Sequence, residues 1–338
     1  MTDKASIQKI FDSFVGKRIL VIGDVMIDSY LWGKVDRISP EAPVPVVALN
    51  RREYRLGGAA NVALNIRNLG GVPILCSVIG EDDKGKVFLD LLDKQDLPSQ
   101  GIISSDERIT TVKFRIIGNN AQMLRVDEEN QDNLTSSEHK ALYTTIKDHI
   151  EKEQIDAIVF EDYDKGVITP ELIKKTVGLA RKTNIPVAVD PKKKNFWNYH
   201  DVDLFKPNLK ELKEGLKMDH IPTDIAELRT AVSELQNRLK GRIIMVTLSD
   251  KGLYYYQYGE QGDGDDALIP ASVRAIADVS GAGDTVIGTA VLCLAVHAPV
   301  RLMATLCNLA GGLVCEHVGV VPVDRERLML EAFKYFGS

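Results

Sequence analysis

The chain has 338 residues, of which 44% are hydrophobic and 27% charged, and its 48 acidic and 42 basic side chains leave a formal net charge of −6. This composition is that of an ordinary globular protein. Its mild acidity argues against nucleic acid as a partner, because nucleic-acid binders usually carry a basic stripe. No apolar run approaches the roughly 20 residues of a membrane span, so no membrane partner is expected.

The N-terminal residues and the cysteines indicate where in the cell the protein is located. Residues 1–10 mix polar and charged side chains and lack a secretory signal. The four cysteines lie in apolar surroundings without a C-x-x-C pair, which is typical of reduced thiols in a cytoplasmic protein. The alternative is a metal cluster, whose ligands would be Cys293, His297, Cys307, Cys315 and His317. These positions fall in apolar helical stretches, which disfavours a metal site.

Apolar runs typical of buried strands alternate with helical patterns along most of the chain. Strands are predicted at 18–23, 72–79, 157–160, 186–189 and 243–246, and helices near 58–69, 83–96, 136–152, 170–182 and 223–240. From residue 282 onward the chain is helical and apolar. Buried strands that alternate with helices imply a mainly parallel sheet covered on both faces, with ligands beyond the carboxyl ends of its strands.

Two segments, about 30–50 and 108–127, instead alternate polar and apolar residues with period two, which is typical of half-buried strands. The second contains a turn at Gly118-Asn119-Asn120. We expect both segments to form antiparallel strands outside the main sheet, as a cover or an interface. Residues 261–266 are polar and rich in glycine, which predicts an exposed hairpin loop.

The most specific motif is the run of small residues from Asp278 to Thr285, which precedes an apolar helix. Small residues before a helix let backbone N–H groups face an anion at the positive end of the helix dipole. Asp284 would stand in the first turn, where a carboxylate can take a proton from an attacking hydroxyl. A plain glycine-rich helix start with aspartate in its favoured first turn explains the pattern equally well.

Two other glycine-containing runs are less specific. Gly57-Gly58-Ala59-Ala60-Asn61 opens a helix, where it would allow a ligand close approach or would merely allow tight packing. The run from Gly80 to Val87 has the spacing of a P-loop. However, a valine replaces the metal-binding hydroxyl residue and three acids would crowd the phosphates, so this interpretation is disfavoured.

Polar residues also follow several predicted strands. Asp24 and Asp28 would bind sugar hydroxyls or cap a turn, and Asp190 and Lys192 follow a later strand. Asn208 and Glu211 would orient a hydrated Mg²⁺ and phosphate oxygens, or form a helix cap with each other. Lys193 and Lys194 are expected to be solvated.

Together these motifs resemble the ribokinase-like sugar kinases, also called the phosphofructokinase-B family. The resemblance covers about residues 14–320 and rests on four motifs in the same order: Gly23-Asp24, Gly57 to Asn61, Asn208-x-x-Glu211 and Gly281 to Asp284. It implies one α/β domain over 1–338, a three-layer sandwich with a mainly parallel sheet and a small β-lid formed by the segments 30–50 and 108–127. It also implies an ATP-dependent kinase and, through the lid strands, a homodimer.

Within that family the chain most resembles the kinases that phosphorylate the anomeric hydroxyl of D-glycero-D-manno-heptose 7-phosphate. This likeness rests on five motifs, among which the stretch Ser39 to Pro45 is the most specific: Gly23 to Asp28, Arg37 to Val46, Gly57 to Asn65, Gln122 to Asp127 and Asp162 to Gly166. A kinase for another sugar, sugar phosphate or nucleoside would share every catalytic residue, and a sugar- or nucleotide-binding regulator that has lost catalysis is a further alternative.

The resemblance assigns roles residue by residue. Asp284 would be the catalytic base, with Gly281, Ala282 and Gly283 as the anion hole. The nucleotide would contact Asn208, Glu211, Thr247, Ser249, Lys251 and Gly252, and Mg²⁺ would be carried by ATP near Asn208 and Glu211 rather than in a cage of protein ligands. The sugar would contact Asp24, Asp28, Gly57, Gly58, Asn61, Arg125, Asp190 and Lys192. Asp278 and Ser280 match positions that bind a monovalent cation such as K⁺ in some relatives.

Two departures from the family pattern qualify this assignment. Val279-Ser280 stands where a Thr-Thr pair is common, a small change that should preserve catalysis. Bifunctional relatives also carry a nucleotidyltransferase with a His-x-Gly-His motif, and residues 317–320 lack its second histidine. The sequence therefore predicts a kinase alone.

Overall fold

The computed structural model describes residues 4–119, 121–259 and 264–337. Its main sheet has nine strands in the order β13-β12-β11-β10-β9-β8-β1-β4-β5, and all neighbours are parallel except the pairs β11–β12 and β12–β13. The strands are β1 (Arg18–Gly23), β4 (Val72–Gly80), β5 (Ile102–Ser105), β8 (Ala157–Glu161), β9 (Val187–Asp190), β10 (Leu204–Phe205), β11 (Ile243–Thr247), β12 (Leu253–Gln257) and β13 (Asp265–Ile269).

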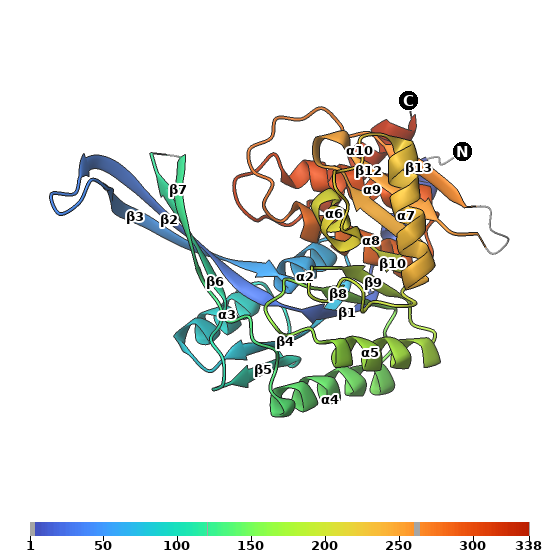
Figure 1. Ribbon diagram of the computed structural model, residues 1–338, viewed down its shortest axis with the longest axis horizontal. Coiled ribbons are helices and arrows are strands. Elements are labelled where there is room, and N and C mark those ends of the chain that lie inside the picture. The colour runs from blue at the N-terminus through green and yellow to red at the C-terminus, as the bar shows by residue number, and fades with distance from the viewer. Residues whose placement is uncertain (1–3, 120, 260–263, 338) are drawn as a thin grey trace.

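Helices cover both faces of this sheet (Figure 1). Ile19 and Val21 of β1 belong to the core on one face, and Leu20 and Ile22 to the core on the other. The first face is covered by α1 (Lys4–Phe14), α2 (Ala59–Asn68), α3 (Asp83–Lys94), α8 (Ala282–Ala295), α9 (Val300–Val314) and α10 (Arg325–Gly337). The second is covered by α4 (Ser136–Lys152), α5 (Pro170–Lys182), α6 (Leu209–Leu216) and α7 (Ile225–Leu239).

The lid is a separate four-stranded sheet that projects from the main body (Figure 1). Its order is β3-β2-β6-β7, formed by β2 (Val25–Ile38), β3 (Pro45–Gly58), β6 (Val112–Gly118) and β7 (Ala121–Glu128). The β2–β6 pair is parallel, which corrects the expectation of purely antiparallel strands. The first hairpin also reaches deeper than residues 30–50, because its base, where Val25 pairs with Gly58, is built into the core.

Local capping explains why several helix boundaries match their predicted positions. Thr135 forms a capping box with Glu138 before α4, and Thr169 caps α5 with Pro170 in its first turn. Of the predicted hairpin loop over residues 261–266, residues 261–263 lie outside the described residues, and Asp265 and Asp266 belong to strand β13, which corrects the end of the loop. Among the described helices, none is long and apolar enough to cross a bilayer.

Candidate active site

Two acidic side chains end neighbouring strands of the main sheet and lie under α8. Glu161 of β8 and Asp190 of β9 are paired in register, so their side chains point to the same face. That face is the one covered by α8, since Ala157, Val159 and Ala188 at alternate positions belong to its core. The carboxyl edge of the sheet therefore places two carboxyl groups beneath the start of α8.

The start of α8 is open toward this edge. Gly281 caps the helix in the left-handed region, with φ 79°, and a Cβ there would lie 2.9 Å from the side-chain nitrogen of Asn61. A Cβ at Gly283 would lie 3.7 Å from an Asp190 oxygen. Together with Ala282, these residues expose the positive end of the helix, which attracts anions.

Asp284, in the first turn of α8, is buried and hydrogen-bonded through both carboxylate oxygens. The Asn61 amide donates to Oδ2 at 2.8 Å, and the Tyr163 hydroxyl donates to Oδ1 at 2.7 Å. Burial raises the pKa of Asp284 to about 6, while these two hydrogen bonds oppose the rise. A carboxylate with a pKa near neutrality is suited to general-base catalysis.

Tyr163 reaches Asp284 from the turn that follows β8, and Asp24 holds this turn in place. The Asp24 carboxylate accepts the backbone N–H groups of Tyr163 at 2.8 Å, Lys165 at 3.2 Å and Val167 at 3.0 Å. Asp24 is also 1% exposed. Of its two roles weighed from the sequence, the structure therefore supports the turn cap and gives no opening to a sugar hydroxyl.

Lys206, Asp190 and Glu161 form a buried charged cluster beside the start of α8. Lys206 Nζ lies 2.7 Å from Asp190 Oδ2. Asp190 Oδ1 and both Glu161 carboxyl oxygens have no hydrogen-bond partner among the described residues. Burial, with the nearby charges of Asp190 and Asp284, raises the pKa of Glu161 well above its usual range. Because buried polar atoms are rarely left unpaired, these oxygens point to a bound group that completes the cluster.

The sequence left two roles open for Asn208 and Glu211, a Mg²⁺ site or a helix cap. The structure shows that they cap α6. Asn208 Oδ1 accepts the Glu211 N–H at 2.9 Å, and Glu211 Oε2 accepts the Asn208 N–H at 2.8 Å. The second Glu211 oxygen is ion-paired with Lys192. Both Glu211 oxygens are thus engaged within the protein, whereas Lys193 and Lys194 are exposed, as expected.

The residues expected around the nucleotide lie at the same edge of the sheet. Thr247, the last residue of β11, is bridged to Asn208. A single 3₁₀ turn over Ser249–Lys251 follows, and both of its end residues are exposed. Gly252, at φ 99°, has no room for a side chain, because a Cβ there would lie 2.1 Å from the Ile269 carbonyl oxygen.

At the base of the lid, Asp28 is buried and ion-paired with Arg115 of β6. Gly57 approaches it closely, since a Cβ at Gly57 would lie 2.3 Å from Asp28 Oδ2. Gly57 and Gly58 end strand β3 rather than starting the helix, although Gly58 also caps α2. Arg125 of β7 lies opposite Arg115, and it is exposed.

Two further motifs hold turns. Burial of Asp278 acts to raise the pKa of its carboxyl group. Hydrogen bonds from the Ser280 N–H at 3.0 Å and the Gly319 N–H at 2.9 Å outweigh this effect and lower the pKa. Asp278 therefore ties the turn before α8 to the chain after α9.

In the P-loop-like run, Asp82 caps α3 by accepting the Gly85 N–H at 2.6 Å, which is where a P-loop would bind phosphate.

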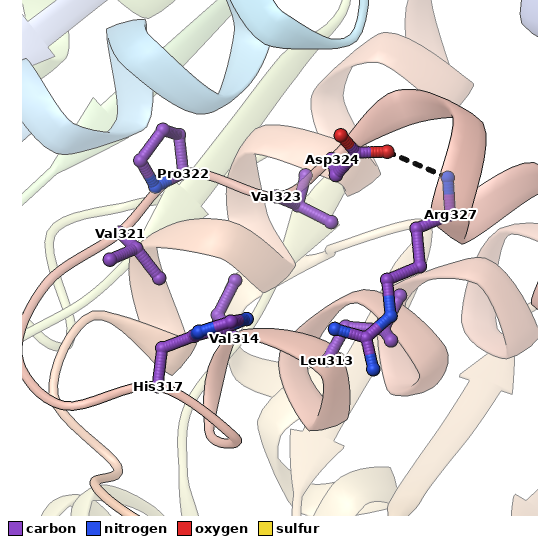
Figure 2. A pocket seen from close by; sticks show the side chains of 8 residues that line it. All are labelled: Leu313, Val314, His317, Val321, Pro322, Val323, Asp324 and Arg327. Carbon is purple, nitrogen blue, oxygen red and sulfur yellow. Dashed lines mark hydrogen bonds between the residues drawn. The ribbon is translucent and has the colours of Figure 1, made fainter.

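A pocket of about 220 Å³ lies apart from these residues, between the end of α9 and the start of α10 (Figure 2). His317, the one histidine of the incomplete nucleotidyltransferase motif, lines it together with Arg327. Asp324 accepts the Arg327 N–H at 2.7 Å and so caps α10. Neither Asp284 nor Asp190 lines this pocket.

The residue-by-residue prediction omitted Tyr163, Lys206 and Glu161. Each follows or ends a strand, so the rule that ligands bind beyond the carboxyl ends of strands includes all three. Tyr163 also lies in the motif from Asp162 to Gly166, which supported the resemblance without being given a role. The burial of Lys206 and Glu161, which makes them notable, depends on α8 lying over them.

Comparisons with known proteins agree with this geometry. The profile of the family described as "pfkB family carbohydrate kinase" matches residues 17–326. The bifunctional protein HldE of Helicobacter pylori (strain J99) is 37% identical over 315 residues, 93% of this chain and 66% of that protein. HldE of Methylobacillus flagellatus is 39% identical over 313 residues, 93% of this chain and 62% of that protein. The chain thus spans about two thirds of the length of the curated relatives it matches.

Solved structures share the fold at low sequence identity. Escherichia coli phosphofructokinase-2 in complex with potassium has a TM-score of 0.75 and 20% identity, covering 96% of this chain and 100% of that one. Arabidopsis thaliana ribokinase complexed with ribose and ATP has a TM-score of 0.70 and 15% identity, covering 95% and 99%. These matches confirm the ribokinase-like α/β fold with its lid. The chain belongs to the pfkB family of carbohydrate kinases, which are ATP-dependent phosphotransferases.

Proposed function

We propose that this kinase transfers the γ-phosphate of ATP to the anomeric hydroxyl of D-glycero-D-manno-heptose 7-phosphate and so forms the 1,7-bisphosphate. The observation that carries the proposal is the position of Asp284, a buried base in the first turn of a helix whose N-terminus is open to an anion. The heptose substrate is supported by the 37% identity to HldE over 93% of the chain.

In the proposed reaction the substrate hydroxyl lies between Asp284 and the phosphate at the start of α8. Asp284 accepts the proton, and the backbone N–H groups near Gly281 and Gly283 stabilise the charge that develops on the transferred phosphoryl group. Asn61 and Tyr163 orient the carboxylate through their hydrogen bonds. Closing the lid over the sugar excludes water, which suppresses ATP hydrolysis.

The residues present fit a hydrated Mg²⁺ that accompanies ATP. Mg²⁺ typically keeps several waters and binds one or two carboxylates together with substrate phosphates. Asp190 Oδ1 and the Glu161 oxygens are buried next to the anion site and have no hydrogen-bond partner among the described residues, although Lys192 Nζ lies 4.0 Å from Asp190 Oδ1. They fit this role better than Glu211, whose oxygens are engaged. When bound, Mg²⁺ neutralises phosphate charge. For K⁺, the proposed position is the turn of Asp278 and Ser280.

The rate of the proposed reaction should rise with pH and level off above a pKa of about 6, because only the ionised Asp284 accepts a proton. In Tyr163→Phe the carboxylate loses a hydrogen bond that stabilises its charge, so the acid limb should move to higher pH. The measurement is the pH dependence of kcat/KM for both proteins. A flat profile across this range, or a shift to lower pH in the variant, would contradict Asp284 as the base.

We also propose a homodimer joined through the lids. The lid projects from the body (Figure 1) and exposes large apolar side chains, including Ile38, Leu49 and Leu124 at 61%, 50% and 54% exposure. Its outer strands, β3 and β7, each have an edge that no strand of this chain occupies among the described residues. Light scattering at micromolar concentration should give twice the 37.4 kDa of one chain, whereas a monomer would contradict the proposal.

The proposed function is tested by ADP release from Mg²⁺-ATP with heptose 7-phosphate, mannose 6-phosphate, fructose 6-phosphate, ribose and adenosine. A strong preference for the heptose phosphate is expected. Turnover of another acceptor would keep the kinase and discard the heptose assignment. Silence across the panel from a folded protein that binds ATP would favour a regulator without catalysis.

A further inference from the structure

One face of the lid sheet lies over the active site and carries most of its charge. From the base of the lid as far as Trp32, the strand registers place eight charged side chains on this face: Arg51, Arg55, Lys113, Arg115 and Arg125, with Asp28, Glu53 and Asp127. Tyr30 is on the same face, and its hydroxyl accepts the N–H of Val320, in the segment after α9. The face is therefore directed at the sheet edge and not at solvent alone.

Four of the five basic side chains on this part of the face have an acidic partner on it. Arg51 lies 3.8 Å from Glu53. Arg55 and Glu53 are 2.7 Å apart. Arg125 and Asp127 are 2.9 Å apart, so Arg125, which was expected to contact the sugar, is already paired within its own strand. Arg115 is paired with Asp28.

Lys113 is the fifth. Its ammonium has neither a hydrogen bond nor an ion pair among the described residues, although the strand registers place it beside Asp28 and Asp127. It is only partly exposed, and burial lowers the pKa of its ammonium. Its ammonium lies over the ring of Tyr163, whose centroid is 4.9 Å from Nζ. The nearby carboxylates of Asp28 and Asp127 offset part of the cost of burying this charge, but each is ion-paired with an arginine. An anionic ligand would therefore stabilise the ammonium further.

The position of Lys113 relative to the base defines what kind of anion fits. Tyr163 connects the two groups, because its hydroxyl donates to Asp284 and its ring carries Lys113. Lys192 lies 5.2 Å from the same ring but is paired with Glu211, and Lys165 is paired with Glu129 at 2.7 Å. The Tyr163 side chain would therefore separate an anion at Lys113 from the hydroxyl that reacts at Asp284. A sugar molecule is long enough to span this separation.

We propose that Lys113 binds the phosphate group that the sugar substrate already carries, and that this contact selects phosphorylated sugars over unphosphorylated ones. The inference rests on the proposed sugar kinase activity but not on the identity of the sugar. An ammonium is a compact charge with three N–H donors, which suits the three terminal oxygens of a phosphate monoester. Lys113 is a specificity residue in this account and takes no part in the proton transfer.

The test compares Lys113→Met and Lys113→Arg with the wild type and with Lys193→Met, a matched control at an exposed lysine. Steady-state kinetics are measured with heptose 7-phosphate, and with mannose 6-phosphate and unphosphorylated mannose as a pair. In Lys113→Met the KM for sugar phosphates should rise about 10- to 100-fold, the usual effect of losing a hydrogen bond to a charged group. The KM for mannose and the kcat should stay near wild-type values, and Lys113→Arg should restore most of the affinity.

A merely structural role for Lys113 would change the two forms of mannose alike, and that result would overturn the inference. A fall in kcat alone, or an enzyme that accepts only unphosphorylated sugars, would overturn it too. A different result would contradict the proposed function. If mannose 6-phosphate or another sugar phosphate is turned over but heptose 7-phosphate is not, the heptose assignment is wrong, and the comparison of phosphorylated with unphosphorylated sugar still decides the role of Lys113.

Discussion

Asp284→Asn is expected to lower kcat by about 10²- to 10⁴-fold, which is the usual contribution of a general base. Asparagine has nearly the same shape as aspartate and can accept a hydrogen bond from Tyr163 through its side-chain oxygen, so the fold should be kept. What it lacks is the ability to take a proton. The measurement is ADP release under saturating substrates, with circular dichroism to confirm the fold.

The matched control is Asp83→Asn, which also changes an aspartate in the first turn of a helix. Asp83 is exposed and pairs with Lys86 on the surface of α3, so its removal should leave kcat unchanged. Near-normal turnover in Asp284→Asn would exclude Asp284 as the base. An equal loss in both variants would indicate a general effect of changing the charge.

Lys206→Met should destabilise the protein by about 3–5 kcal/mol, the cost of leaving one partner of a buried ion pair unpaired. The Lys206 side chain is 3% exposed and lies 2.7 Å from Asp190. Its removal would leave Asp190 buried beside Glu161 and Asp284, with Lys192 at 4.0 Å as a more distant positive charge. The measurement is urea unfolding at neutral pH. Nucleotide binding should weaken as well, because the anion site would then be surrounded by acids.

Lys210→Met serves as its control, because Lys210 has an 81% exposed side chain and pairs with Glu214 one turn along α6. Exposed pairs of this spacing contribute about 0.3–0.5 kcal/mol. A loss of less than about 1 kcal/mol in Lys206→Met would show that the cluster tolerates the missing charge, contrary to our account of it.

The parts of the fold that depend on local sequence were predicted well. Helices α4 and α5 begin and end where their caps and periodicity indicate. Helix α1 was missed, although its core residues Ile7, Phe11 and Phe14 have helical spacing, because the N-terminal segment was considered only as a possible targeting signal. The glycine pair at 57–58 was assigned to a helix start, and Gly58 does cap α2. The sequence did not show that both glycines also end strand β3, where they pair with Met26 and Val25.

The candidate site shows the same division between local and tertiary information. The small residues before Asp284 predict an anion site, because that chemistry depends on one helix start. The sequence shows which polar residues follow strands but not which of them belong to the site. Their burial and their hydrogen-bond partners depend on other elements of the fold. Asp24 is a turn cap because the chain after β8 folds back over it. Lys113 matters because its neighbours on the lid are paired, which only the strand register reveals.

The most direct test of the central claim is the identity of the product formed from heptose 7-phosphate and Mg²⁺-ATP, read by ³¹P and ¹H NMR. We predict one ADP for each sugar and a new phosphate signal coupled to the anomeric proton, alongside the original phosphate on C7. A phosphate on any other carbon would contradict the placement of the anomeric hydroxyl at Asp284. ADP formed together with free inorganic phosphate and unchanged sugar would contradict the kinase reaction proposed for this chain.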